Sequence, residues 1–245
     1  MADSPHNISI NQKAYKVAEL LHDTPDVDVF KFKAEDGYRL KFDPGMFVML
    51  TYSNPDTKEK ITRAFSIASE PEGDTVDFFI HMIHGRITSK LETAQVGSIY
   101  YLTGPYGQFK FMPNEDRKVL FIAGGTGLAP FMSMLKYIRK LKSGTDVVLL
   151  YSIRFPNEII RKEELEQLEK DIGMKMVITV TRQENSEGWN GEKGHIDDAM
   201  ISKYTPDIMD RTTYICGPLP FVKAMKDALA KLKVPNEKIK ADVWG

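Results

Sequence analysis

The stretch VLFIAGGTGLAPFMSMLKYIRKL, residues 119–141, combines a short apolar run, a glycine cluster and a helical pattern. The run 119–123 is too short for a helix and is bounded by glycines, so it predicts a buried strand. Gly124, Gly125 and Gly127 allow a sharp turn that brings backbone N–H groups close to a ligand. Pro130 suits a first helical turn, and apolar residues follow it at helical spacing. A strand, a glycine turn and a helix N-terminus in this order predict a site for a phosphate group.

The glycine cluster does not complete the dinucleotide fingerprint G-x-G-x-x-G. When the fingerprint is aligned on Gly125, the second glycine is Gly127, but Pro130 stands where the third is expected. A tight turn between a strand and a helix is therefore an alternative to phosphate binding. The rest of the sequence is needed to choose between a phosphate site and a tight turn.

Composition places the chain among ordinary globular proteins. Its 245 residues allow one large domain or two modest ones, and 42% hydrophobic and 27% charged residues are typical values. A formal net charge of −1 gives no electrostatic footprint for nucleic acid. The sequence shows neither a secretory signal nor an apolar run of membrane-spanning length, so we expect a cytoplasmic protein. The single cysteine, Cys216, excludes an internal disulfide and a four-thiolate metal centre, and we predict no metal site.

The secondary-structure pattern changes once along the chain. Up to Met112, short β-like runs alternate with turn sequences and predict a small antiparallel barrel or sandwich. These runs are residues 14–21, 27–33, 47–52, 61–67, 76–83 and 98–102. After MPNEDR (112–117), runs at 119–123, 147–151, 176–181, 212–216 and 239–243 alternate with helical stretches at 130–142, 161–171 and 219–232. This alternation is typical of a parallel α/β sheet, so we predict two domains, residues 1–114 and 115–245.

Two motifs in the first half are candidates for ligand binding. RAFSIAS, residues 63–69, is strand-like, so Arg63 and Phe65 share one face while Ser66 points to the other. HGRITSKL, residues 84–91, places a glycine before hydroxyl side chains at the start of a helix. That geometry serves equally as a helix cap by Thr88 or Ser89 and as a phosphate cradle.

Six motifs follow one another along the chain: PGMFV (44–48), RAFSIAS (63–69), GRITS (85–89), GPYG (104–107), AGGTGLAP (123–130) and ICGPLPFV (215–222). Their order and spacing resemble the ferredoxin–NADP reductase superfamily, the flavin-dependent NAD(P)H reductases, across nearly the whole chain. The resemblance implies an antiparallel flavin-binding barrel followed by an α/β pyridine-nucleotide domain. This agrees with the fold class predicted from the alternation of strands and helices.

The resemblance assigns flavin-binding roles in the first domain. It implies that Arg63 pairs with a flavin phosphate and that Phe65, where the family usually has tyrosine, stacks on the isoalloxazine ring. It places Ser66 near flavin N5 as a catalytic residue. The further flavin-binding positions are Ala64, Phe79, Ile80, His81, Gly85, Ile87 and Thr88. His81 and His84 have the spacing of a metal pair, but on a strand their side chains point to opposite faces.

In the second domain, the resemblance gives the nucleotide pyrophosphate to the glycine turn. The residues concerned are Gly124, Thr126, Gly127 and Pro130. Cys216, Gly217 and Pro218 would line the nicotinamide pocket, with Cys216 as a catalytic residue; a small buried apolar side chain is its ordinary alternative role. Trp244, the third catalytic candidate, would cover the flavin and yield to nicotinamide, or simply cover a sheet edge.

Arginines rather than acids follow the second and third strands of this domain. The NAD fingerprint expects an acid at the end of the second strand, but VVLLY (147–151) is followed by Ser152, Ile153 and Arg154. Arg182 follows the next run, in a segment that resembles the family segment contacting the 2′-phosphate. A guanidinium can hold a phosphate bidentately, so this pattern favours NADPH over NADH as the hydride donor. Glu158 is the alternative, as an acceptor for the ribose hydroxyls of NADH.

These motifs predict a flavin-dependent oxidoreductase that passes hydride from NAD(P)H to bound FAD. Electrons then leave to a small redox protein such as a ferredoxin, a flavodoxin or an oxygenase component. FMN is the alternative flavin, because no motif specifies an adenine pocket. Two other functions stay open: a reductase that holds free flavin as a substrate, and a non-catalytic electron-transfer or regulatory subunit.

Overall fold

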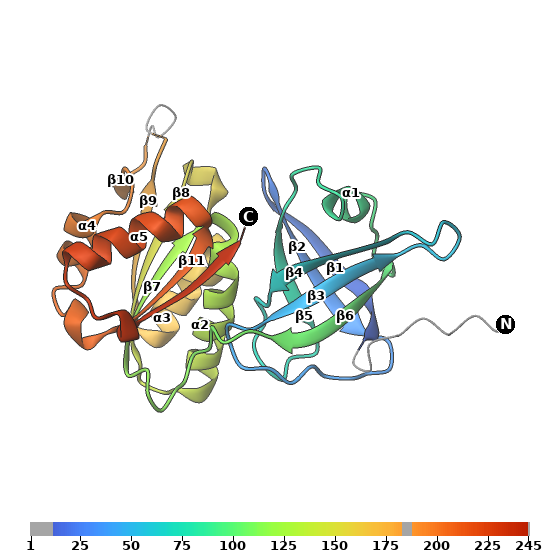
Figure 1. Ribbon diagram of the computed structural model, residues 1–245, viewed down its shortest axis with the longest axis horizontal. Helices are drawn as coiled ribbons and strands as arrows, with labels where there is room; N and C mark the ends of the chain where they lie inside the picture. Colours follow the sequence, from blue (N-terminus) through green and yellow to red (C-terminus); the bar gives the residue numbers. More distant parts are fainter. Residues whose placement is uncertain (1–11, 183–187, 245) are drawn as a thin grey trace.

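The computed structural model describes residues 12–182 and 188–244. Within these ranges the chain forms two lobes that lie side by side, a curved antiparallel sheet and an α/β layer structure (Figure 1). The segment 107–117 connects the last strand of the first lobe to the first strand of the second.

The first lobe is a six-stranded antiparallel sheet that curves into a barrel. Its strands are β1 (Lys13–Thr24), β2 (Val27–Ala34), β3 (Phe47–Ser53), β4 (Lys60–Ser66), β5 (Val76–His81) and β6 (Ile99–Tyr106), hydrogen-bonded in the order β4-β3-β6-β1-β2-β5. Alternate residues point inward, so Phe30, Phe32 and Phe78 fill the core, with the Phe32 and Phe78 rings 5.5 Å apart. The short helix α1 (Thr88–Leu91) lies beside one end of the barrel (Figure 1).

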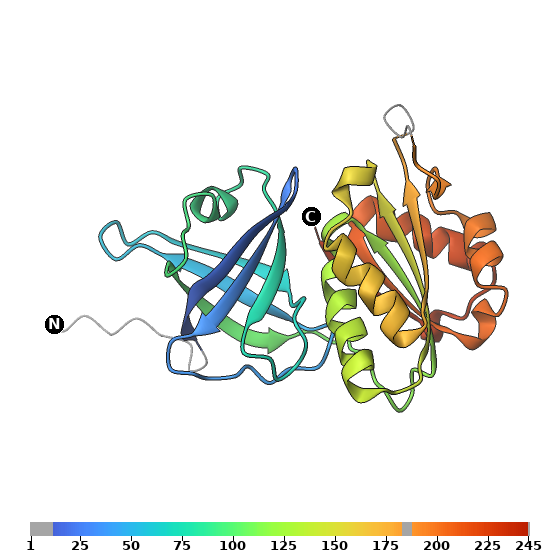
Figure 2. The same ribbon diagram turned by 180° about the vertical axis from the view of Figure 1, so that it is seen from behind.

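The second lobe is a six-stranded parallel sheet between helices. Its strands are β7 (Lys118–Gly124), β8 (Asp146–Ile153), β9 (Lys175–Val180), β10 (Glu192–Lys193), β11 (Thr212–Pro218) and β12 (Ile239–Trp244), in the order β10-β9-β8-β7-β11-β12. The helices are α2 (Ala129–Leu141), α3 (Lys162–Ile172), α4 (Asp198–Tyr204) and α5 (Leu219–Lys231), with 3₁₀ turns η1 (Gly125–Leu128), η2 (Pro156–Glu158), η4 (Ile208–Asp210) and η5 (Asn236–Lys238). Helices α4 and α5 cover one face, and α2 and α3 cover the other (Figures 1 and 2). The strand order reverses between β7 and β11, and ligands of such sheets bind at that point.

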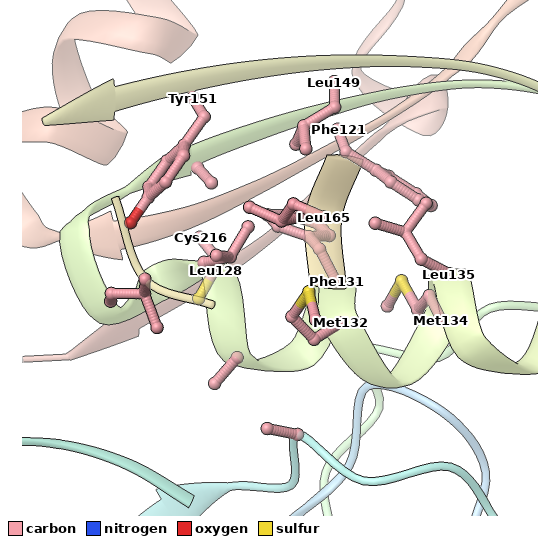
Figure 3. Close-up of a cluster of buried hydrophobic side chains, with 14 of the residues drawn as sticks. Phe121, Leu128, Phe131, Met132, Met134, Leu135, Leu149, Tyr151, Leu165 and Cys216 are labelled. Carbon is pink, nitrogen blue, oxygen red and sulfur yellow. The ribbon is translucent and has the colours of Figure 1, made fainter. Parts of the chain in front are cut away.

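Both faces of the parallel sheet are buried, which explains its uninterrupted apolar runs. On the α2 side, the Phe121 and Phe131 rings stack 4.8 Å apart within a cluster that Leu149, Leu165 and other side chains complete (Figure 3). On the α5 side, Leu120, Ile122, Leu150 and other alternate residues form a separate cluster. The sheet is therefore a rigid base for the loops at its carboxyl edge.

Helix α2 fixes the two lobes against each other. The core cluster on its side continues into the barrel through Val27, Val29, Ala68 and Phe79. Gly45, at a φ of +102°, permits this approach, because a Cβ there would lie 2.2 Å from the Phe109 carbonyl oxygen and 2.5 Å from Cε of Met134 in α2. An ion pair of 3.1 Å between Lys140 and Glu72 adds a polar contact across the same boundary.

The predicted fold class is confirmed, and most predicted elements match observed ones within a few residues. Strand β6 is longer than predicted, since it continues through Gly104 to Tyr106. Helix α4 was not predicted, because its 7 residues include one buried side chain, Ile201, and show little periodicity. Asp197 begins this helix by accepting a hydrogen bond of 2.8 Å from the Met200 backbone N–H. In the described residues, no helix has both the length and the apolar character needed to cross a membrane.

Candidate active site

A cavity of about 570 Å³ opens where the carboxyl ends of the parallel strands face the barrel. The α/β lobe contributes the ends of β7, β8, β11 and β12, and the barrel contributes Asp26, Val27 and His81. This is the edge at which open parallel sheets bind their ligands, and the volume suits a nucleotide-sized molecule. Of the predicted site residues, the cavity is lined by Gly124, Thr126, Arg154, Pro218, Trp244 and His81.

The glycine turn after β7 is shaped by close backbone approaches. Gly125 has a φ of +55°, in the region that favours glycine. A Cβ on Gly127 would lie 2.2 Å from the carbonyl oxygen of Cys216, so only glycine lets η1 rest against β11. A Cβ on Gly124 would lie 3.0 Å from the ring of Phe221. The turn leads through η1 into α2, with Pro130 buried in the first helical turn, so the N-terminal end of α2 is directed at the cavity.

Ser66 and Asp242 meet across the two lobes. Ser66 ends β4, and its hydroxyl lies near the Asp242 carboxyl group on β12. Burial raises the pKa of Asp242, and the Ser66 contact opposes this shift. The pair therefore joins the predicted flavin domain to the C-terminal strand beside the cavity.

Cys216 lies on β11, next to Asp242 in the register of the sheet. Its side chain is buried in the cluster under α2, beside Leu128, rather than in the cavity (Figure 3). Burial, and to a smaller extent the Asp242 charge, raises the pKa of the thiol, so the sulfur stays protonated and is a poor nucleophile. These surroundings are those of a small buried apolar side chain, which is the alternative role of Cys216. A catalytic role for Cys216 stays a prediction.

Trp244 lies at the carboxyl end of β12, paired in register with Pro218, and both line the cavity. The Trp244 side chain is partly exposed, with 37% of the residue accessible. Behind this pair, a Cβ on Gly217 would lie 2.7 Å from the Phe221 ring. Trp244 is therefore an aromatic side chain that is accessible from the cavity.

The outer part of β4 carries the predicted flavin contacts. Arg63 and Ala64 are exposed, and Arg63 Nη1 donates a hydrogen bond of 3.0 Å to the Thr62 carbonyl oxygen. Phe65 is half-buried, with its ring 5.9 Å from Phe78. Strand β4 is an edge strand that ends at Ser66, so it carries an exposed cation, a half-buried aromatic ring and a hydroxyl close together, although none of the three lines the cavity. A guanidinium, an aromatic ring and a hydroxyl are groups that can bind the phosphate and the ring system of a flavin, and their flavin contacts stay a prediction.

Other predicted flavin residues have mainly structural surroundings. The Thr88 hydroxyl accepts a hydrogen bond of 2.7 Å from the Gly85 N–H and donates one of 3.1 Å to the Gly85 carbonyl, so it closes the loop. The side chains of Ile87, Phe79 and Ile80 are buried, Phe79 between the lobes and Ile80 inside the barrel. Because the Ile80 side chain points into the barrel, the prediction that Ile80 binds cofactor concerns its backbone groups and stays a prediction.

Arg154, which was predicted to pair with a 2′-phosphate, lines the cavity, but its guanidinium is bound by two carboxylates. Its guanidinium binds Glu158 through Nε at 3.2 Å and Nη2 at 2.6 Å, and Nη2 also binds Asp26 of the barrel. The hydrogen bond to Glu158, which has the larger effect, and the contact with Asp26 together raise the pKa of Arg154. Arg182 is exposed, and its backbone N–H donates to the Arg154 carbonyl oxygen.

His81 and His84 bind different carboxylates. His81 Nε2 lies 3.0 Å from Asp26, whereas His84 Nδ1 lies 2.8 Å from Glu92. Within residues 12–182 and 188–244, no group of three or more His, Cys, Asp or Glu side chains is arranged to hold a metal ion.

Sequence reasoning missed several residues of the site. The ring of Phe221 lies against Gly124 and Gly217. Phe221 is part of the ICGPLPFV motif, so the motif could have indicated it as a site residue. Asp242 lies two residues before Trp244 and could have been considered with it. Asp26 belongs to the turn sequence TPD, where nothing indicates a contact with the other domain.

Comparisons with known proteins agree with this architecture. The model of the oxidoreductase FAD-binding domain matches residues 15–111, and that of the oxidoreductase NAD-binding domain matches residues 121–227. The glycine betaine monooxygenase reductase subunit of Chromohalobacter salexigens is 32% identical over 220 residues, which cover 87% of this chain and 59% of that protein. NADH-cytochrome b5 reductase 1 of Aspergillus oryzae is 31% identical over 198 residues, which cover 77% of this chain and 67% of that protein.

Solved structures show the same two-lobed arrangement. The cytochrome b5 reductase domain of Ulva prolifera nitrate reductase has a TM-score of 0.82 at 27% identity, covering 98% of this chain and 100% of that chain. The ferredoxin reductase in carbazole 1,9a-dioxygenase has a TM-score of 0.81 at 26% identity, covering 96% of this chain and 69% of that chain.

A barrel joined to a parallel sheet, with a glycine turn facing their common cavity, defines a two-domain flavin- and nicotinamide-binding oxidoreductase. The chain belongs to the ferredoxin–NADP reductase superfamily of FAD-dependent NAD(P)H oxidoreductases, as its motifs predicted. It spans about 59% of the length of the first curated relatives that it matches.

Proposed function

We propose that this chain is a reductase that moves hydride from NAD(P)H to bound FAD and passes electrons on to a protein acceptor. One observation carries the proposal: the glycine turn and Trp244 line one cavity, and Asp26, Val27 and His81 of the barrel form its other side. This cavity supports a nucleotide site between the proposed domains, 1–114 and 115–245.

The nucleotide side of the proposal rests on the carboxyl edge of the parallel sheet. The backbone around Gly125 and the N-terminal end of α2 offer donors and a favourable dipole to a pyrophosphate. Gly127 keeps this turn seated against β11, and the Phe221 ring supports Gly124 and Gly217 from the α5 side. The cavity wall formed by Pro218 and Trp244 then receives the nicotinamide end.

The flavin side rests on the exposed part of β4. Arg63 would hold a phosphate with its guanidinium fork, and Phe65 and Trp244 would bound the ring system. When bound, the flavin supplies the exchange between two-electron and one-electron transfer that amino-acid side chains lack. Trp244 also limits the access of water until nicotinamide takes its place.

In this proposal, Ser66 and Asp242 exchange a proton with the ligand bound beside them. The raised pKa keeps the Asp242 carboxyl group protonated to a higher pH than an exposed aspartate, so it can hold a proton beside the Ser66 hydroxyl. The hydroxyl both donates and accepts, so it can pass a proton between the carboxyl group and a neighbouring ligand atom.

For the electron acceptor we propose a redox protein of an oxygenase system. Two proteins to which this chain is similar are named as a glycine betaine monooxygenase reductase subunit and a ferredoxin reductase in carbazole 1,9a-dioxygenase. Use of free flavin as a substrate is the second candidate, because Arg63 and Ala64 are exposed along an edge strand from which a ligand can leave. The cytoplasmic location stays a prediction.

Gel filtration followed by NADH oxidation with ferricyanide separates the two candidates. We expect the chain to retain a flavin through gel filtration and to reduce ferricyanide without added flavin. Activity that appears only with added FAD or FMN, and saturates with it, would instead identify a free-flavin reductase.

A further inference from the structure

Arg154 lies at the centre of an ion cluster that joins the two lobes. Its guanidinium donates to both oxygens of Glu158 and to Asp26 in the turn between β1 and β2. Glu158 is itself held by the backbone N–H groups of Arg154, at 3.1 Å, and Phe155, at 3.4 Å. His81 Nε2 contacts the same Asp26 oxygen at 3.0 Å. The arginine is thus clamped by one carboxylate from each lobe.

The Asp26–Arg154–Glu158 cluster lies at the position where open parallel sheets contact the ribose of a bound dinucleotide. Arg154 directly follows β8, the strand next to β7 on the side away from β11. In open parallel sheets, the residue that distinguishes the two dinucleotides lies at the end of that second strand. Arg154, Glu158 and Asp26 all line the cavity that also contains Gly124 and Thr126 of the glycine turn.

The charge balance of the cluster opposes a phosphate. A free guanidinium at this position would attract the 2′-phosphate of NADPH. Here two carboxylates surround one guanidinium, so negative charge is in excess and a phosphate dianion would be repelled. The uncharged ribose hydroxyls of NADH carry no such penalty.

We infer that the Asp26–Arg154–Glu158 cluster makes this site selective for NADH, and that Asp26 of the flavin domain is a specificity-determining residue for the nucleotide. The inference rests on the proposed function and deepens it by naming the nucleotide class. It replaces the preference for NADPH that the arginines alone suggest.

The test compares kcat/KM for NADH and NADPH in wild type, Asp26→Asn, Glu158→Gln and the double variant. We expect wild type to prefer NADH and each single variant to raise the NADPH-to-NADH ratio by about tenfold, which equals about 1.4 kcal/mol. Adding Arg154→Ala to the double variant should abolish the gain, because the released guanidinium is its source. Titration with 2′,5′-ADP and 5′-AMP gives the same comparison without turnover, and 2′,5′-ADP should gain affinity in the double variant.

Glu72→Gln is the matched control, because Glu72 also forms an ion pair across the lobes, with Lys140 at 3.1 Å, but does not line the cavity. The ratio of kcat/KM for NADPH to kcat/KM for NADH in the Glu72→Gln variant should equal that of wild type. A wild type that prefers NADPH, or ratios unmoved by Asp26→Asn and Glu158→Gln in folded protein, would overturn the inference while leaving the reductase function intact. Failure of both nucleotides to reduce the flavin of wild type would instead contradict the proposed function.

Discussion

Gly127→Ala tests whether the glycine turn positions the nucleotide. The new Cβ would lie 2.2 Å from the Cys216 carbonyl oxygen and 2.9 Å from the Gly217 nitrogen, whereas ordinary contact begins near 3.4 Å. The turn must therefore move by about 1.2 Å away from β11, which is buried and held by strands on both sides. A misplacement of about 1 Å can cost about 100-fold in rate, so we expect kcat/KM for NADH to fall by about that factor. Overpacking should also lower the free energy of unfolding by about 1–3 kcal/mol.

The assay is NADH oxidation with ferricyanide, together with the flavin content and a thermal melt of each protein. Flavin content should stay near that of wild type, because Gly127 belongs to the α/β lobe and not to the barrel. Gly73→Ala is the control: Gly73 lies in a barrel turn, and its Cβ would meet the Glu70 carbonyl oxygen at 3.3 Å, a much smaller conflict. A Gly127→Ala protein with wild-type kcat/KM and wild-type melting temperature would refute the reasoning.

Three further predictions concern the flavin, the C-terminus and pH. Arg63→Ala should lower flavin affinity at least about tenfold, since a charge-assisted hydrogen bond contributes about 1.5–3 kcal/mol; full flavin occupancy after gel filtration would remove Arg63 from the site. Deleting Trp244 and the residue after it should increase nicotinamide affinity and change the flavin absorption spectrum, whereas an unchanged spectrum and KM would assign Trp244 to the sheet edge. Burial raises the pKa of Asp77, so its stabilising contribution is complete below its unfolded value of 3.8 and is lost as pH rises through the folded pKa. The melting temperature of Asp77→Asn relative to wild type should therefore rise between about pH 4 and pH 7; a difference that does not vary with pH would speak against this assignment.

The fold was predictable because its signals are local. Alternation places Phe30 and Phe32 inside the barrel, and unbroken apolar runs such as 119–123 identify strands buried on both faces. The glycine turn was equally readable, since positive φ at Gly125 and the crowding at Gly127 both require glycine. Helix α4 was not predicted, because a short helix with one buried side chain carries almost no periodic signal.

The site was less predictable, because its decisive contacts join distant parts of the chain. Arg154 and Asp26 are 128 residues apart, and only the docking of the two lobes shows that the arginine is already bound. The same holds for Asp242, which the last strand of the sheet places near Ser66. A motif places Cys216 at the end of a strand but does not show to which face its sulfur points. Sequence patterns specify which residues end a strand, whereas tertiary packing decides which of them reach the ligand.

Anaerobic reduction of the bound flavin, with NADH and NADPH in parallel, tests the central claim most directly. The purified chain should carry FAD, and stoichiometric NADH should bleach its visible absorption rapidly, with NADPH reacting more slowly. A chain that binds no flavin, or whose flavin neither nucleotide reduces, would contradict the assignment of this protein as a flavin-dependent NAD(P)H reductase.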